Sequence, residues 1–267
     1  MGGDNEDVGR PLWLWPNLLS LDAPLVALLW QLLFARCFHS EWRAVSAVLL
    51  AITVWLIYAG DRMLDAFNNE AHEAQSPRHV FYRRHWRIVL PVWIGLLATG
   101  TWLALTRLDP PLLQRGLLLV AAVAVYLAMV HVAPRRWRRL WPKEAAVAIL
   151  FALGASLDTW SSIRSSEDAL TIAFFSALCW INCRAIEAWE HAAIWPTAGL
   201  AACIAVAATV TLAAHRPVLA SAEFASALAF ICLDRSRLRL SSDALRVLAD
   251  VALLSPLPLL PLAGKLV

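Results

Sequence analysis

The feature that most constrains this sequence is its series of long apolar runs separated by short charged segments. Apolar residues make up 60% of the 267 positions, and only 16% are Asp, Glu, Lys or Arg, whereas soluble domains carry about 25% charged residues. A membrane-crossing helix needs about 20 apolar residues, so the chain has enough for eight or nine. The pattern predicts an all-α, polytopic membrane bundle and disfavours a soluble enzyme. The net charge of +3 also disfavours a nucleic-acid partner, because such binding usually needs a concentrated basic face.

The apolar runs predict about nine transmembrane helices in one domain. They cover residues 23–38, 44–60, 87–106, 112–133, 143–160, 169–188, 197–214, 218–233 and 244–263. No linker divides the chain, so we predict a single transmembrane domain over 23–267. We predict that residues 1–22 form a polar N-terminus and an interfacial segment, because Trp is favoured at the headgroup level.

The basic residues predict the orientation in the membrane. Lys and Arg accumulate in cytoplasmic loops. With nine spans and a cytoplasmic N-terminus, 16 of the 23 basic residues fall on the cytoplasmic side and 7 on the other. We therefore expect a cytoplasmic N-terminus and a C-terminus on the opposite side, in the plasma (inner) membrane of a bacterium.

Two acidic groups lie at the predicted cytoplasmic ends of the second and sixth spans. Asp61 and Asp65 are four residues apart, so they share one face of a continued helix. Glu187 and Glu190 occupy the corresponding end of the sixth span. A carboxylate at membrane depth costs at least roughly 2.5 kcal/mol, so these positions call for a reason.

A divalent cation and a phosphorylated ligand would supply that reason. Mg²⁺ binds through one or two carboxylates and keeps substrate phosphates as further ligands, and Arg or Lys in neighbouring loops would bind the phosphates. The alternative is that the carboxylates neutralise nearby arginines while the basic loops contact anionic membrane lipid.

The residues around the first acidic group resemble the UbiA superfamily of intramembrane prenyltransferases. A span ending in DRxxD, an acidic segment four spans later and nine helices are similar to that family's architecture. Asp61 and Asp65 match the last two aspartates of the family motif, and Arg62 matches its frequent arginine. Lys143 and Arg78 resemble basic residues in two of the family's loops.

The resemblance implies transfer of an isoprenyl group from an allylic diphosphate to a hydrophobic acceptor, either aromatic or lipid, with Mg²⁺ as cofactor. It implies that the metal ligands and catalytic residues are Asp61, Asp65, Glu187 and Glu190. The residues implied in binding the diphosphate are Arg62, Arg78 and Lys143. An aromatic-lined cavity would protect the allylic cation from water, and its candidate lining residues are Trp55, Tyr58, Trp180 and Trp189, with ordinary helix packing as the alternative role.

The sequence departs from the family at the start of the first motif, where Ile57 and Tyr58 replace the leading Asn and Asp. A non-catalytic relative that binds lipid or a partner is therefore the alternative to an enzyme. A small-solute transporter is a third possibility, but it would need polar residues through the middle of the membrane.

Three further charged residues lie inside apolar runs. Arg246 and Asp250 are four apart on the ninth predicted span, so we expect them to neutralise one another. Glu223 lies near the start of the eighth span, from which we expect its side chain to extend to the outer surface.

Overall fold

The computed structural model describes residues 12–68, 77–131 and 143–263, and within these ranges the chain is helical without strands. Its elements are η1 (Leu12–Leu14), α1 (Trp15–Leu18), α2 (Asp22–Cys37), α3 (Ala44–Asn68), α4 (Pro77–Arg107), α5 (Pro110–His131), α7 (Lys143–Ala155), η2 (Leu157–Ser162), α8 (Ser166–Glu190), α9 (Thr197–Leu212), α10 (Pro217–Ser236), α11 (Ser242–Ala252) and α12 (Pro256–Leu259). The prediction of an all-α bundle is confirmed.

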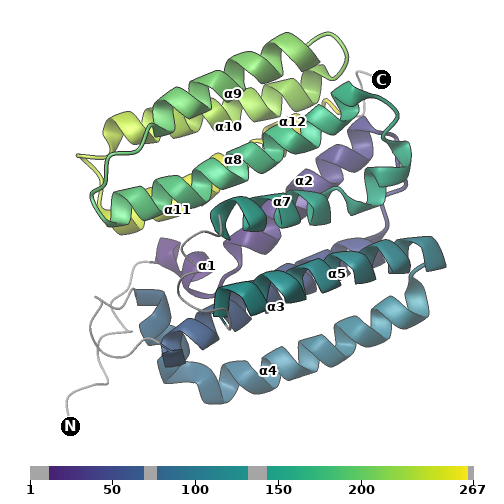
Figure 1. Cartoon of the computed structure of the whole chain (residues 1–267), viewed down its shortest axis with the longest axis vertical. Coiled ribbons are helices and arrows are strands. Elements are labelled where there is room, and N and C mark those ends of the chain that lie inside the picture. Colours follow the sequence, from purple (N-terminus) through teal and green to yellow (C-terminus); the bar gives the residue numbers. More distant parts are fainter. Residues whose placement is uncertain (1–11, 69–76, 132–142, 264–267) are drawn as a thin grey trace.

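The helices lie side by side in layers (Figure 1). Helices α9 and α10 form one outer pair, α8 and α11 lie next to them, α2 and α7 occupy the middle, and α3, α5 and α4 lie at the opposite end. Helix α2 packs against α3, α7, α10 and α11. The sequence therefore places an N-terminal helix at the centre of the bundle.

The helix boundaries follow from local residue chemistry. Pro217 occupies the first position of α10, where its missing N–H costs no hydrogen bond. The side chains of Ser165 and Ser241 cap α8 and α11 by accepting from the backbone N–H groups of Asp168 and Ala244. These signals place the helix starts within short polar connections between the apolar runs.

Among the described residues, five helices are long and apolar enough to cross a membrane. They contain the candidate spans Ala44–Ala66, Val80–Arg107, Pro110–Val130, Ser166–Glu190 and Pro217–Ser236. A sixth span is possible if the segment Leu12–Leu18 and helix α2, which are bent by 78° relative to each other, are counted together. These helices fit a multi-pass membrane protein.

The count of nine spans stays a prediction. Each predicted segment contains a helix, but α7 has 13 residues and α11 has 11. At 1.5 Å per residue they reach only about 20 Å and 16 Å, less than the roughly 30 Å hydrocarbon core. Because the orientation was derived from nine spans, it too stays a prediction.

The largest core cluster of the described residues draws on α2, α7, α8, α9, α10 and α11, with an aromatic group between α2 and α8. Trp30 of α2 stacks on Phe175 of α8 with ring centroids 4.0 Å apart, and Phe34 contacts both rings. All three side chains are fully buried. In contrast, none of the residues in the best apolar windows of α4 and α5 is buried, so in a membrane these helices present their apolar surfaces to lipid.

Candidate functional site

A central cavity of about 190 Å³ opens between α2, α3, α7, α8 and α11. Its walls combine apolar residues, such as Val26, Phe151 and Ile186, with polar and charged ones. The polar lining residues are Asp22, Tyr58, Arg62, Asn182, Cys183 and Asp250. A cavity with apolar walls and a few convergent polar groups is the usual form of a small-molecule site.

Arg62 in the cavity wall is hydrogen-bonded to the connection between α1 and α2. The Arg62 side chain is buried, and its Nη1 donates to the carbonyl oxygen of Asn17 at 2.7 Å and to Ser20 Oγ at 2.5 Å. Ser20 has a positive φ of 58° and also shares a 2.8 Å hydrogen bond with the Tyr82 hydroxyl. Arg62 was predicted to bind diphosphate. It lies in the cavity wall, and its hydrogen bonds hold the α1–α2 connection in place.

Two carboxylates of the cavity wall share one amide nitrogen. Asn17 Nδ2 donates to Asp22 Oδ2 at 2.6 Å and to Asp250 Oδ2 at 3.1 Å. Asn182 Nδ2 donates to Asp250 Oδ1 at 3.1 Å. Residues from α1, α2, α8 and α11 thus form one hydrogen-bonded group.

Asn17 and Asp22 were not predicted as site residues, because they lie in the segment predicted to be interfacial. The expected pairing of Arg246 with Asp250 also gave no hint of this group. The available signal was the cost of a carboxylate within an apolar run, which applies to Asp250 as much as to the two acidic groups chosen.

The cavity lining itself contains neither predicted acidic pair. From α3 it includes Tyr58 and Arg62, whereas Asp61 and Asp65 are half-buried outside it. Glu187 and Glu190 at the end of α8 also lie outside it. The acidic residues that contact the cavity are Asp22 and Asp250.

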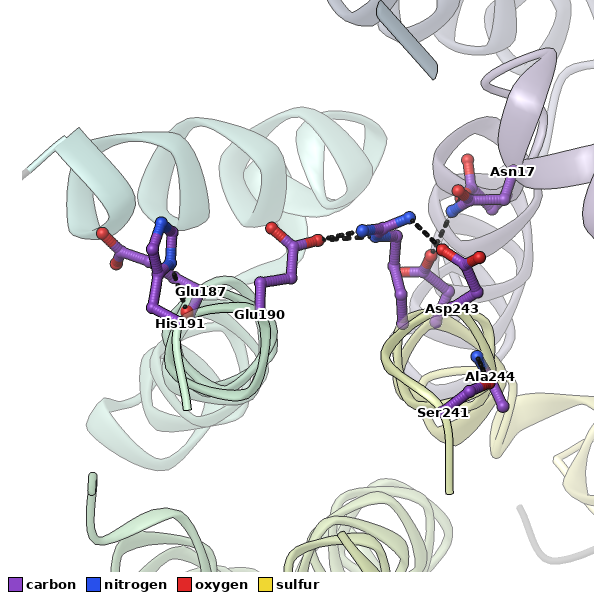
Figure 2. Close-up of polar contacts among 10 residues, drawn as sticks. Asn17, Glu187, Glu190, His191, Ser241, Asp243 and Ala244 are labelled. Atoms are coloured by element: carbon purple, nitrogen blue, oxygen red, sulfur yellow. Dashed lines mark hydrogen bonds and ion pairs between the residues drawn. The ribbon is translucent and has the colours of Figure 1, made fainter. Parts of the chain in front are cut away.

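Both glutamates at the end of α8 are engaged by arginines. Glu187 accepts from Arg184 one turn earlier, and Glu190 accepts from Nε of Arg246 at 2.7 Å as well as from its Nη2. Figure 2 shows the two glutamate side chains turned apart, with Glu190 directed toward α11 and Glu187 near His191. Pairing with nearby arginines is the role that was predicted as the alternative to metal binding.

The implied magnesium centre stays a prediction. No group of three or more His, Cys, Asp or Glu side chains within 12–66, 80–130 and 143–263 is arranged to hold a metal ion. Of the predicted phosphate-binding residues, Lys143 begins α7 with its Nζ 3.7 Å from Glu144, and the side chain of Arg78 lies outside the described residues.

The predicted aromatic lining is present at one position. Tyr58 contacts the cavity, whereas Trp55, Trp180 and Trp189 stand outside its lining. Trp180 packs edge-on against Trp195 with ring centroids 5.5 Å apart. This contact agrees with ordinary helix packing, the alternative role predicted for Trp180.

Two expectations for charged residues are wrong. Arg246 donates to Glu190 and Asp243, while Asp250 accepts from Asn17 and Asn182, so helical spacing did not identify their partners. Glu223 does not extend to the surface but is fully buried in the bundle.

No known protein family, curated protein or solved structure matches this chain. The resemblance to intramembrane prenyltransferases therefore depends on the motif residues given above. The functional inference depends on the central cavity and its surroundings.

Proposed function

We propose that the protein is a multi-pass membrane protein that binds an amphiphilic molecule in its central cavity. The observation that carries this proposal is the composition of the cavity wall, which combines Asp22, Arg62 and Asp250 with apolar residues such as Phe151. The polar side suits a headgroup, and the apolar side suits the beginning of a hydrocarbon tail. Ion pairing of Glu187 and Glu190 favours binding over metal-dependent chemistry.

A cavity-filling substitution tests this proposal. Val147 lines the cavity from α7, and Ile149 is an exposed residue two positions further along the same helix. Val147→Phe should lower the affinity for a 12-carbon amphiphile at least about tenfold, which corresponds to about 1.4 kcal/mol, because the added ring takes up space in the cavity. Ile149→Phe should leave the affinity unchanged.

Native mass spectrometry of the detergent-purified protein provides the measurement, with dodecylamine, dodecanol and dodecyl phosphate as probes. At least one probe should bind with one molecule per chain. If none binds, or if both phenylalanine variants bind as the unmodified protein does, the cavity is not an amphiphile site.

Magnesium-dependent prenyl transfer is a second candidate, favoured by the position of the DRxxD residues on α3. Arg62 lines the central cavity, and Asp61 and Asp65 lie within one turn of it on the same helix. The test is binding of farnesyl diphosphate with and without Mg²⁺. This candidate predicts that binding requires Mg²⁺ and falls at least about tenfold in Asp61→Ala and Asp65→Ala, whereas metal-independent binding in both variants would reject it.

A further inference from the structure

We propose that the end of the bundle formed by the α8–α9 and α10–α11 loops binds anionic phospholipid. These loops are residues 191–196 and 237–241. The inference concerns the outer surface of the protein and does not depend on ligand binding in the central cavity. It is carried by exposed aliphatic side chains that lie beside exposed arginines at the level of the lipid headgroups.

The two loops belong to one surface. Helix α8 ends at Glu190 and α10 ends at Ser236, and Figure 1 shows both loops at the same end of the bundle. The Asp234 carboxylate connects them, because it accepts from Trp189 Nε1 and from the backbone N–H of Ala198, each at 3.3 Å. The side chains of both loops can therefore contact the same molecule.

Two aliphatic side chains extend from this surface. Leu238 is 94% exposed and Ile194 is 92% exposed, the highest values for large apolar side chains among the described residues. The candidate span Pro217–Ser236 has 20 residues and reaches about 30 Å, the thickness of the hydrocarbon core. The headgroup region adds roughly 5–7 Å on each side, and Leu238 follows Ser236 by two residues, at most about 7 Å. Leu238 therefore lies where acyl chains meet headgroups.

The charge beside these side chains is positive. Arg235 and Arg239 are exposed on either side of Leu238 in the sequence. Within the described part of the chain, neither enters an ion pair, whereas the acidic residues near the two loops are paired with other arginines. These pairs are Glu187 with Arg184, Asp234 with Arg237, and both Glu190 and Asp243 with Arg246.

This combination suits an anionic phospholipid. A guanidinium group binds phosphate oxygens through paired hydrogen bonds, and an aliphatic side chain beside it contacts the first carbons of the acyl chains. Basic residues interspersed with apolar ones at a membrane surface are typical of anionic lipid recognition. A soluble partner would have to displace the headgroups that surround helix ends at this depth.

Native mass spectrometry of the detergent-purified protein tests the inference, with dioleoyl phosphatidylglycerol and dioleoyl phosphatidylcholine as probes. The two lipids share their acyl chains and differ in headgroup charge. The unmodified protein should bind phosphatidylglycerol about tenfold more tightly than phosphatidylcholine. The double variant Arg235→Gln with Arg239→Gln should lose most of this preference and keep its phosphatidylcholine affinity within about twofold, because only the charge is removed.

Three control variants should keep the preference. Arg107→Gln with Arg164→Gln removes the same charge from two other exposed arginines, which lie at the end of α4 and just before α8, at the opposite end of the bundle in Figure 1. Arg235→Lys with Arg239→Lys retains both positive charges. Val147→Phe fills the central cavity, which the two loops do not line.

The other outcomes overturn the inference in distinguishable ways. Equal affinities of the unmodified protein for the two lipids would show that this end does not select anionic lipid. A preference that persists in the double glutamine variant would leave the loops as a surface for another partner, such as a protein. An equal loss in the Arg107 and Arg164 control would show a general effect of net charge. A loss in Val147→Phe would place the lipid in the central cavity, in agreement with the proposed function but not with this inference.

Discussion

Trp30→Ala should cost about 3–5 kcal/mol of unfolding free energy, the range for removing a large buried aromatic side chain. Trp30 is fully buried, stacks on Phe175 and contacts Phe34. Its indole N–H also donates to the carbonyl oxygen of Leu253 at 2.9 Å, which ties α2 to the end of α11. Alanine removes the ring contacts and leaves this buried carbonyl without its donor.

Thermal unfolding in detergent, followed by tryptophan fluorescence, measures this loss as a fall of about 10 °C in the midpoint. Trp102→Ala is the matched control, because Trp102 is 58% exposed on α4 and should shift the midpoint little. Trp30→Phe should lie between the two, since it keeps most of the ring contact but loses the N–H donor. Equal midpoints for Trp30→Ala and Trp102→Ala would show that the α2–α8 contact does not stabilise the bundle.

Arg246→Met should destabilise the protein by about 2–3 kcal/mol, because it removes the charged hydrogen bonds that a buried guanidinium donates to Glu190 and Asp243. The Arg246 side chain is only 5% exposed and bridges Glu190 of α8 to Asp243 of α11. Methionine keeps much of the length and apolar contact of the arginine stem. The expected loss of stability therefore measures the removal of the charge and not the creation of a cavity.

The exposed Arg43 provides a matched control for this experiment. It also pairs with two carboxylates, those of Glu41 and Asp109, but its side chain is 39% exposed. Arg43→Met should cost less than about 1 kcal/mol, the range for surface ion pairs. Equal losses for the two arginine variants would contradict a structural role of the buried Arg246 bridge.

The fold class could be predicted because apolar length is a strong, local signal. Each predicted span contains a helix, including the long α3, α4, α5, α8 and α10. The extent of the shorter elements could not be predicted, because an apolar run such as 143–160 does not show where a helix gives way to the 3₁₀ turn η2. Composition alone does not fix that break.

The acidic residues of α3 and α8 were recognised from the sequence, but the partners of Glu190 and of Arg246 were not. Helical spacing relates Arg246 only to residues of its own helix, whereas its Glu190 partner comes from a helix 56 positions earlier. Asn17 contacts Asp250 across 233 positions. Such pairings depend on how α1, α8 and α11 pack, which no local pattern in the sequence encodes.

The sharp bend between α1 and α2 has a consequence for the order in which the protein assembles. Asn17 and Ser20 obtain their partners from Arg62 of α3, Tyr82 of α4 and Asp250 of α11. During synthesis α11 emerges long after α1, so the hydrogen bond to Asp250 can form only once α11 has been made. The α1–α2 bend is therefore fully fixed later than the helices that lie between α2 and α11 in the chain, and the central cavity is complete only when α11 has packed.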